Sequence, residues 1–159
     1  MKIIFLDIDG VLNSEEWIME NHEKILAAQS SLIYRGETEI NPSALDMIKT
    51  LVEKTDAKIV ISSSWRILYN KDELNKIFRE SGWNNFELFD VTPHRLPGRT
   101  IRGDEVNAWL NSFGREKIEK FICIDDDSDF YPDQNLVKTS WKKGFQSQHL
   151  ELALQLLNS

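Results

Sequence analysis

The sequence of 159 residues contains one cysteine and no long apolar run. A single cysteine, Cys123, cannot form a disulfide within the chain, and its apolar surroundings are typical of a buried, unreactive thiol. Only four apolar residues follow the first lysine before Asp7, which is too short for a signal sequence, and no segment is long enough to cross a membrane. We therefore expect a cytoplasmic protein in a reducing compartment, without membrane partners.

Basic side chains are also scarce. The chain has 19 Lys and Arg against 26 Asp and Glu, which gives a formal net charge of -7. Wide, non-specific wrapping of nucleic acid needs an array of basic side chains, so the composition argues against it, although a strand end could still enter a pocket. With 41% hydrophobic residues and five Trp, the chain suffices for one core, and we expect a single domain over residues 1–159.

Three short apolar segments each end in a group of polar side chains. Such segments are typical of strands that are buried on both faces of a parallel sheet. The carboxyl ends of parallel strands meet at the edge where ligands bind, so the sequence predicts one shared site. The polar groups are, in chain order, Asp7 and Asp9, then Ser62 to Ser64, then an acidic run from Asp125 to Asp129.

Asp7 and Asp9 are two residues apart and would project to the same side of an extended chain. Like charges in that arrangement repel unless a cation or a shared proton lies between them. Gly10 follows and permits a tight turn. The alternative is a surface turn rich in Asp and Gly, against which the other two segments argue.

The remaining pattern predicts alternating strands and helices, and therefore a parallel sheet with helices on both faces. A polar insertion at about residues 13–40 interrupts it, with an amphipathic piece at 17–26 and a turn at Arg35 and Gly36. We expect further strands at residues 57–61, 86–89, 121–124 and 136–137, and helices that begin at residues 41–43 or span residues 71–80, 104–112 and 150–157.

This order of motifs resembles the haloacid dehalogenase (HAD) superfamily of aspartyl phosphotransferases. More narrowly, it resembles the HAD domains of the Swiss Army Knife RNA repair proteins. The segments that carry the likeness are DIDGVLN, VISSSWR, RGDEVNAWL and ICIDDDSDF, from Phe5 to about Asp129. The resemblance implies an α/β Rossmann-like HAD fold in which the short insertion forms a flap and a minimal cap, so that the pocket is open to large substrates.

The resemblance also implies a role for each acidic residue. Asp7 would be the nucleophile that forms an aspartyl-phosphate, and Asp9 would protonate the leaving oxygen and then deprotonate the attacking water. Mg²⁺ would be the cofactor, held by Asp7, by Asp9 through its backbone carbonyl, and by the acidic run. In that run we favour Asp126, with Asp125 next, as the ligand.

For phosphate binding, Ser62 matches the family's hydroxyl, and we favour it over Ser63. Ser63 and Ser64 are alternatively helix caps. The family's third motif is usually a Lys, whereas this chain has Arg102, which can bind phosphate through two N–H groups. The competing cations are Arg99, Lys117 and Lys120.

Other polar residues near these motifs have ambiguous roles. Trp65 and Arg66 either shape the entrance or contact a second phosphate; alternatively, Trp65 packs in the core and Arg66 forms a surface ion pair. We expect His94 to be exposed, and Asp127 and Asp129 to cap the following segment or lie in solvent.

These features predict a Mg²⁺-dependent phosphomonoester hydrolase that acts on a phosphorylated small molecule, a nucleotide or a nucleic-acid end. Asp9 favours hydrolysis over dehalogenation, because the family's dehalogenases lack that second carboxylate. Two alternatives stay open: a small-metabolite phosphatase or phosphotransferase with the same chemistry, and a catalytically silent domain that binds phosphorylated ligands. The sequence gives no indication of the oligomeric state.

Overall fold

The computed structural model describes residues 1–30 and 40–159 of the chain. The turn expected at Arg35 and Gly36 lies outside the described residues. Within these two ranges, every helix is too short or too polar to cross a membrane.

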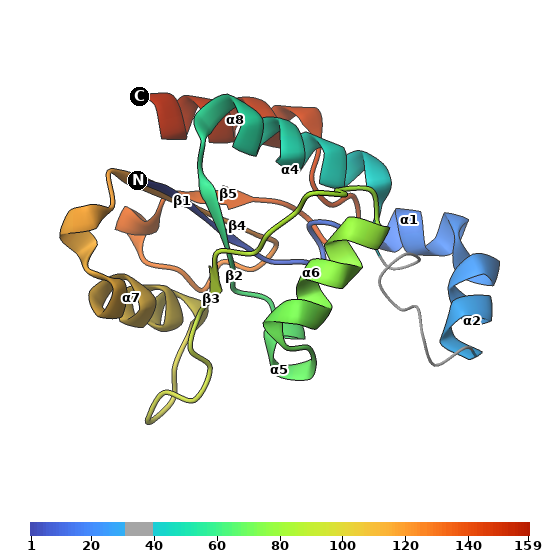
Figure 1. Ribbon diagram of the computed structural model, residues 1–159, viewed down its shortest axis with the longest axis horizontal. Helices are drawn as coiled ribbons and strands as arrows, with labels where there is room; N and C mark the ends of the chain where they lie inside the picture. The colour runs from blue at the N-terminus through green and yellow to red at the C-terminus, as the bar shows by residue number, and fades with distance from the viewer. Residues whose placement is uncertain (31–39) are drawn as a thin grey trace.

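Five parallel strands form the central sheet, in the order β3-β2-β1-β4-β5 (Figure 1). The strands are β1 (Lys2–Leu6), β2 (Lys58–Ile61), β3 (Asp90–Val91), β4 (Lys120–Asp125) and β5 (Leu136–Lys138). β1 lies in the middle, and its last residue, Leu6, pairs with Ile61 of β2 and with Ile124 of β4. The three central strands therefore end level with one another, which brings the polar residues that follow them to one edge of the sheet.

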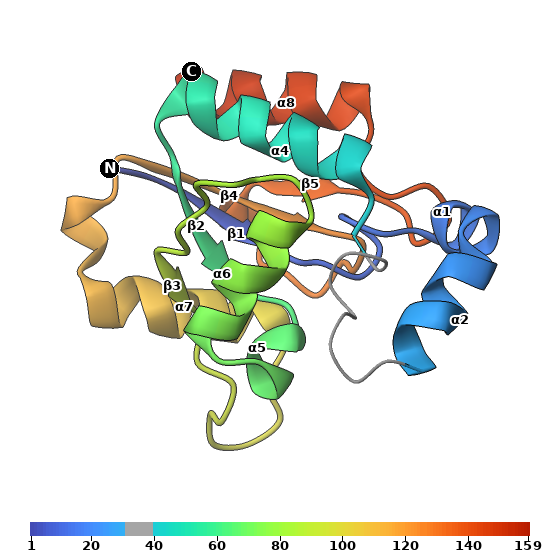
Figure 2. The same ribbon diagram turned by 45° about the vertical axis from the view of Figure 1, so that its right-hand side comes forward.

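Helices cover both faces of the sheet. α4 and α8 lie side by side over one face, while α7 covers the other (Figures 1 and 2). The helices are α1 (Glu15–Glu20), α2 (His22–Ser30), α4 (Pro42–Thr55), α5 (Trp65–Leu68), α6 (Lys71–Glu80), α7 (Arg102–Phe113) and α8 (Ser147–Asn158), with short 3-10 turns η1 (Arg115–Lys117) and η2 (Pro132–Gln134). The expected α/β architecture is confirmed.

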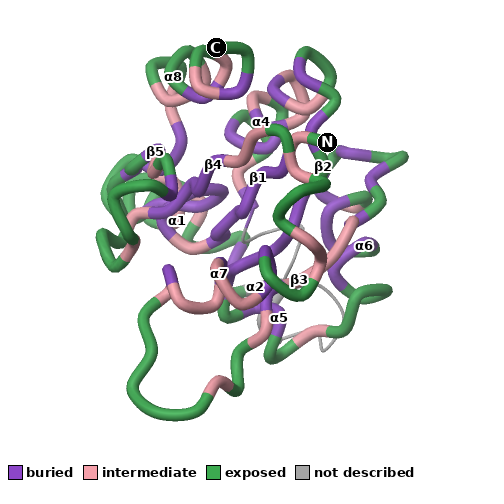
Figure 3. Tube along the Cα trace, turned by 90° about the vertical axis from the view of Figure 1, so that its left-hand side faces the viewer, coloured by how far each residue is buried: buried purple, intermediate pink, exposed green. Residues whose placement is uncertain are grey.

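The alternation of side chains along β1 divides the core between the two faces. Ile4 and Leu6 belong to the larger cluster, which includes residues of α4, α6 and α8, whereas Ile3 and Phe5 pack with residues of α7. All four side chains are fully buried, and Figure 3 shows the sheet as a buried centre within more exposed helices and loops. The apolar run thus has the two-sided burial that a central parallel strand requires.

Side-chain caps fix where two of the expected helices begin. Asn41 accepts a hydrogen bond from the Ser43 N–H of 3.0 Å at the start of α4, where Pro42 occupies the first helical position. Asn70 and Glu73 form a reciprocal capping box at the start of α6. These contacts satisfy N–H groups that have no partner within a helix.

The expected strand at residues 86–89 is wrong, because the third strand is Asp90–Val91. Phe86 and Leu88 are buried, so the alternation of apolar residues was real. The Leu88 N–H, however, donates to Oδ1 of Asn75 in α6 over 2.7 Å. The next N–H, that of Phe89, donates to the Ile59 carbonyl of β2 over 3.1 Å, so hydrogen bonding to β2 begins only at the end of the expected segment and the paired strand follows it.

Candidate active site

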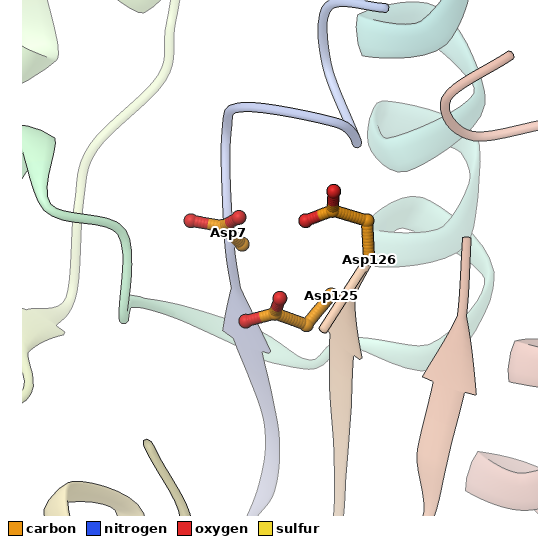
Figure 4. Close-up of side chains that lie close together, drawn as sticks. All are labelled: Asp7, Asp125 and Asp126. Carbon is orange, nitrogen blue, oxygen red and sulfur yellow. The ribbon is translucent and has the colours of Figure 1, made fainter. Parts of the chain in front are cut away.

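Asp7, Asp125 and Asp126 come together at the carboxyl ends of β1 and β4 (Figure 4). Each offers a carboxylate oxygen, and these oxygens lie within 4.8 Å of one another. Asp7 follows β1 directly and donates its N–H to the Ile124 carbonyl over 3.0 Å, which fixes it beside the end of β4. The structure thus brings together three of the four acidic residues that we expected at a metal site.

Gly10 allows Asp126 to approach this cluster. Its φ is +77°, and a Cβ at this position would overlap the Asp126 side chain. Both features exclude larger residues, because a left-handed backbone and a close approach each favour glycine. The turn after β1 is therefore shaped around the acidic run after β4.

Burial makes the negative charge of this cluster costly. Asp7 is 5% exposed and Asp125 is 1% exposed. Burial, followed by repulsion from Asp125, raises the pKa of Asp7 to about 7, against the opposing effects of Arg102 and a hydrogen bond from Ser63. Burial likewise raises the pKa of Asp125 to about 6, and it raises the pKa of Asp126. A bound cation would relieve this electrostatic cost.

One buried carboxylate oxygen of the cluster has no hydrogen-bond partner in the part of the chain that the structure describes. Oδ1 of Asp125 accepts from the Asp127 N–H over 2.9 Å, whereas Oδ2 of Asp125 is buried without a hydrogen bond among the described residues. Buried polar atoms are nearly always paired, and an exception calls for an explanation such as an ion. Several carboxylate oxygens close together, one of them buried without a hydrogen bond, fit a hard divalent cation such as Mg²⁺.

Arg102 supplies positive charge on the other side of the cluster. Its Nη1 lies 3.8 Å from Oδ1 of Asp7, and its Nε lies 4.0 Å from Oδ2 of Asp125. Asp129 fixes the start of α7 by accepting a hydrogen bond of 3.0 Å from the Arg102 N–H. The expected third-motif cation therefore lies at the site, and Asp129 caps α7 rather than the segment that follows it.

The three competing cations do not lie in this cluster. Lys117 and Lys120 lie just before or at the start of β4, which places them at the opposite edge of the sheet from the acidic residues. Arg99 is exposed in the loop before α7. His94, in the same loop, is exposed as expected.

The two serines after β2 have different surroundings. Ser63 is the serine whose side chain hydrogen bonds to Asp7, and its Oγ also accepts from the Trp65 N–H over 3.3 Å. The Ser62 carbonyl accepts hydrogen bonds from the guanidinium groups of Arg66 and Arg102. The hydroxyl that bonds to Asp7 is thus that of Ser63, while the preference for Ser62 as the phosphate-binding serine stays a prediction.

Asp9 does not crowd against Asp7 as its spacing predicts. Its Oδ1 accepts from Nδ2 of Asn13 over 2.9 Å, and its Oδ2 accepts from Nε1 of Trp65 over 3.0 Å. The alternation of side chains applies only to extended chain, whereas β1 ends at Leu6 and a turn includes Asp9. The repulsion that we expected between Asp7 and Asp9 occurs instead between Asp7 and Asp125.

Arg66 is neither a surface ion pair nor a free phosphate ligand. It is 9% exposed, and its guanidinium donates to the carbonyls of Ser62, Ser63 and Thr92. Glu105 completes its environment, with Oε2 only 2.7 Å from Nη2 of Arg66. Arg66 therefore holds the backbone after β2 in place.

Sequence reasoning missed Glu105 and Asn13 as site residues. Glu105 lies one turn after Arg102, and its Oε2 is 4.0 Å from Nε of Arg102, so it restrains both arginines. Asn13 accepts from the Gly10 N–H over 3.0 Å while it donates to Asp9. The only signal for Asn13 was its place at the end of the DIDGVLN segment, and the signal for Glu105 was its spacing of three residues from Arg102.

Comparison with known proteins identifies the family. A family model described as the HAD domain in Swiss Army Knife RNA repair proteins matches residues 3–150. Comparison with curated proteins gives no match, and comparison with solved structures gives none either. HAD membership supports a phosphatase-like activity in general terms. Because the match covers nearly the whole chain and agrees with the five-stranded parallel sheet, the chain belongs to the family of HAD domains in Swiss Army Knife RNA repair proteins.

Proposed function

We propose that this protein is a Mg²⁺-dependent phosphomonoester hydrolase in which Asp7 is the nucleophile. The observation that carries the proposal is the placement of Asp7 between two further carboxylates, Asp125 and Asp126, and the guanidinium of Arg102. A carboxylate can attack an anionic phosphate only where positive charge screens both groups. Mg²⁺ would supply that charge and act as a Lewis acid on the phosphoryl oxygens.

The residues that would hold Mg²⁺ are Asp7, Asp125 and Asp126, together with the backbone carbonyl of Asp9. In the first step, a carboxylate oxygen of Asp7 forms a bond to phosphorus while the ester P–O bond breaks. The leaving oxygen takes a proton from Asp9. In the second step, water attacks the phosphorus of the aspartyl-phosphate, Asp9 accepts the proton of that water, and inorganic phosphate leaves as the Asp7 carboxylate re-forms.

The hydrogen bonds to Asp9 suit this exchange of protons. Trp65 and Asn13 each donate to one oxygen of the carboxylate, so both its position and its orientation are set. Each carboxylate oxygen has a second lone pair that remains available. Arg102 and the Ser63 hydroxyl are the groups that would orient the phosphoryl oxygens.

We further propose that the substrate is a phosphorylated nucleic-acid end and that the chain is one domain with a flap. The description of the matching family, which names RNA repair proteins, supports the substrate class. The insertion contributes only the short helices α1 and α2 in the described residues. A small insertion supports an open pocket that a polymer end can enter.

The test is phosphate release from p-nitrophenyl phosphate and from a 3′-phosphorylated oligonucleotide, with Mg²⁺ and with EDTA. We expect turnover of both substrates only with Mg²⁺. A radiolabelled phosphoryl group should be recovered on the peptide that contains Asp7 after acid quenching. Binding of inorganic phosphate without turnover of either ester would instead identify a silent binding domain.

A further inference from the structure

The loop between β5 and α8, residues 139–146, lies at the same edge of the sheet as the acidic cluster and beside α1 (Figure 2). Its first residue, Thr139, donates through Oγ1 to the Gly10 carbonyl over 2.7 Å. Near its end, the Phe145 N–H donates to the Val11 carbonyl over 2.9 Å. The loop is therefore attached at two points to the turn that follows the nucleophile.

Two further features fix this loop. Gly144 has a φ of +67°, and a Cβ there would lie 2.9 Å from the Val11 carbonyl oxygen, so only glycine permits this approach. At the tip of the loop, the Trp141 carbonyl accepts from the Glu15 N–H over 2.8 Å. The Lys142 carbonyl accepts from the Glu16 N–H over 3.1 Å, so the tip is bound to the start of α1.

The side chains at the tip are nevertheless exposed. Trp141 is 47% exposed, whereas Trp65, Trp83 and Trp109 are at most 7% exposed. Lys142 and Lys143 are also exposed, and neither takes part in the ion pairs found among the described residues. A large aromatic ring and two adjacent cations thus project from a fixed backbone in a chain with a net charge of -7.

The spacing suits a short nucleic-acid segment. Gly10, to which Thr139 is bonded, packs against Asp126 of the cluster. Trp141 is two residues beyond Thr139, at the start of a turn that the Gly144 N–H closes on the Ser140 carbonyl, and two residues of chain span at most about 7 Å. Two stacked nucleotides span about the same length, at roughly 3.4 Å each along a strand.

We propose that Trp141, Lys142 and Lys143 bind the nucleotides next to the terminal phosphate of a single-stranded nucleic-acid end. A base stacks on the Trp141 indole, and the two ammonium groups contact the adjoining phosphodiesters. Stacking on an aromatic side chain accepts any base, so this contact selects for a nucleic-acid end without selecting its sequence. The inference rests on the proposed phosphatase function and names what the enzyme recognises beyond the phosphate.

The test compares kcat/KM for a 3′-phosphorylated oligonucleotide with kcat/KM for p-nitrophenyl phosphate in each variant. Trp141→Ala should lower this ratio at least tenfold, and Trp141→Phe should restore much of it because a smaller ring still stacks. The double variant Lys142→Ala/Lys143→Ala should reduce the salt dependence for the oligonucleotide, by a slope of about 0.7 per lost phosphate contact on a single strand. The matched control, Lys54→Ala/Lys117→Ala, removes two exposed lysines near the opposite edge and should leave the ratio and slope unchanged.

Binding gives a readout that does not depend on turnover. The same oligonucleotide should quench tryptophan fluorescence in the Asp7→Asn protein, and the additional Trp141→Phe change should remove most of that quenching. An unchanged ratio of the two kcat/KM values in folded Trp141→Ala protein would overturn the inference. Unchanged quenching in the Asp7→Asn/Trp141→Phe protein would overturn it as well. Turnover of p-nitrophenyl phosphate with refusal of every oligonucleotide end would overturn it too, while the phosphatase proposal would survive. If the wild-type protein turned over none of the esters, that result would count against the phosphatase proposal alone, because the quenching measurement still decides the role of Trp141.

Discussion

Nε1 of Trp65 donates a hydrogen bond of 3.0 Å to Oδ2 of Asp9. The two residues are 56 positions apart in sequence, and the bond joins the segment after β2 to the turn after β1. Trp65 is 5% exposed, so the indole is both a packing residue and the group that orients the proposed acid–base catalyst. Trp65 is thus a core residue rather than an entrance residue, and it makes one polar contact at the site.

This contact predicts that Trp65→Phe will lower kcat for phosphate release by about tenfold, equivalent to ~1.4 kcal/mol of transition-state free energy. Phenylalanine keeps most of the packing but cannot donate to Asp9. Trp83→Phe, another buried tryptophan at 7% exposure, is the matched control and should affect stability without this loss. Steady-state kinetics and thermal melts of both variants provide the measurement, and equal kcat values would exclude an orienting role for Trp65.

Asp7→Asn should abolish turnover by several orders of magnitude, because an amide is nearly isosteric but is not a carboxylate nucleophile. The same change should not destabilise the metal-free protein at pH 8. Burial and Asp125 disfavour the charge on Asp7, so a neutral side chain removes an unfavourable interaction. A purified variant that kept more than about a tenth of wild-type kcat would exclude Asp7 as the nucleophile.

The raised pKa of Asp7 predicts how stability and metal affinity depend on pH. The value rises from 3.8 to about 7 on folding, so the folded protein holds this proton more tightly than the unfolded chain. Without metal, this contribution to stability is complete below about pH 4 and is lost as the pH rises toward 7. Mg²⁺ binds the ionised carboxylate, so its affinity should change in the opposite direction.

We therefore expect Mg²⁺ to bind roughly 100-fold more weakly at pH 5 than at pH 8 from the protonation of Asp7 alone. Titration calorimetry across this range measures the affinity, and melting curves with and without Mg²⁺ measure the stability. The Asp7→Asn protein is the control, in which the pH dependence of stability near neutral pH should diminish. A pH-independent affinity for Mg²⁺ in the wild type would contradict the placement of the metal at Asp7.

The buried ion pair between Arg66 and Glu105 predicts a loss of stability when one partner is removed. Glu105→Gln leaves the Arg66 charge buried with less compensation, which typically costs about 3–5 kcal/mol. A change of 1 kcal/mol shifts Tm by about 2–4 °C in a domain of this size, so Tm should fall by at least 6 °C. Asp133→Asn breaks the exposed pair with Arg115, whose side chains are 50% and 67% exposed, and should shift Tm little.

The sequence was sufficient to predict the central strands of the sheet and the acidic cluster, because local patterns specify both. An apolar run that ends in acidic residues indicates a central strand, and level strand ends bring Asp7 and Asp125 together without any long-range information. The alternation of side chains in an extended chain gave the wrong position for Asp9, because a turn begins there. It also failed to separate Ser62 from Ser63, since their difference depends on how the chain bends after β2.

Contacts between distant segments could not be predicted at all. The partner of Arg66 lies on α7, and the partner of Asp9 lies on α5, a helix of four residues that the periodicity did not reveal. The strand expected at 86–89 was placed too early, and the partners of its backbone, Asn75 for the Leu88 N–H and Ile59 for the Phe89 N–H, are also distant in sequence. Side chains that bond across the fold carry no local signature.

Asp126 and Asp127 are neighbours with the same side chain, yet only Asp126 belongs to the acidic cluster. Asp127 is exposed, so the pair provides a matched test of the metal site. Asp126→Asn should raise the Mg²⁺ concentration for half-maximal activity at least tenfold, because an amide oxygen replaces a charged ligand, whereas Asp127→Asn should leave it nearly unchanged. Asp129 is unsuitable as the control because it caps α7 next to Arg102. The measurement is the titration of activity against Mg²⁺ in the Asp126→Asn and Asp127→Asn proteins. Equal midpoints in the two variants would remove Asp126 from the ligand set and leave Asp125 as the residue of β4 that binds the metal.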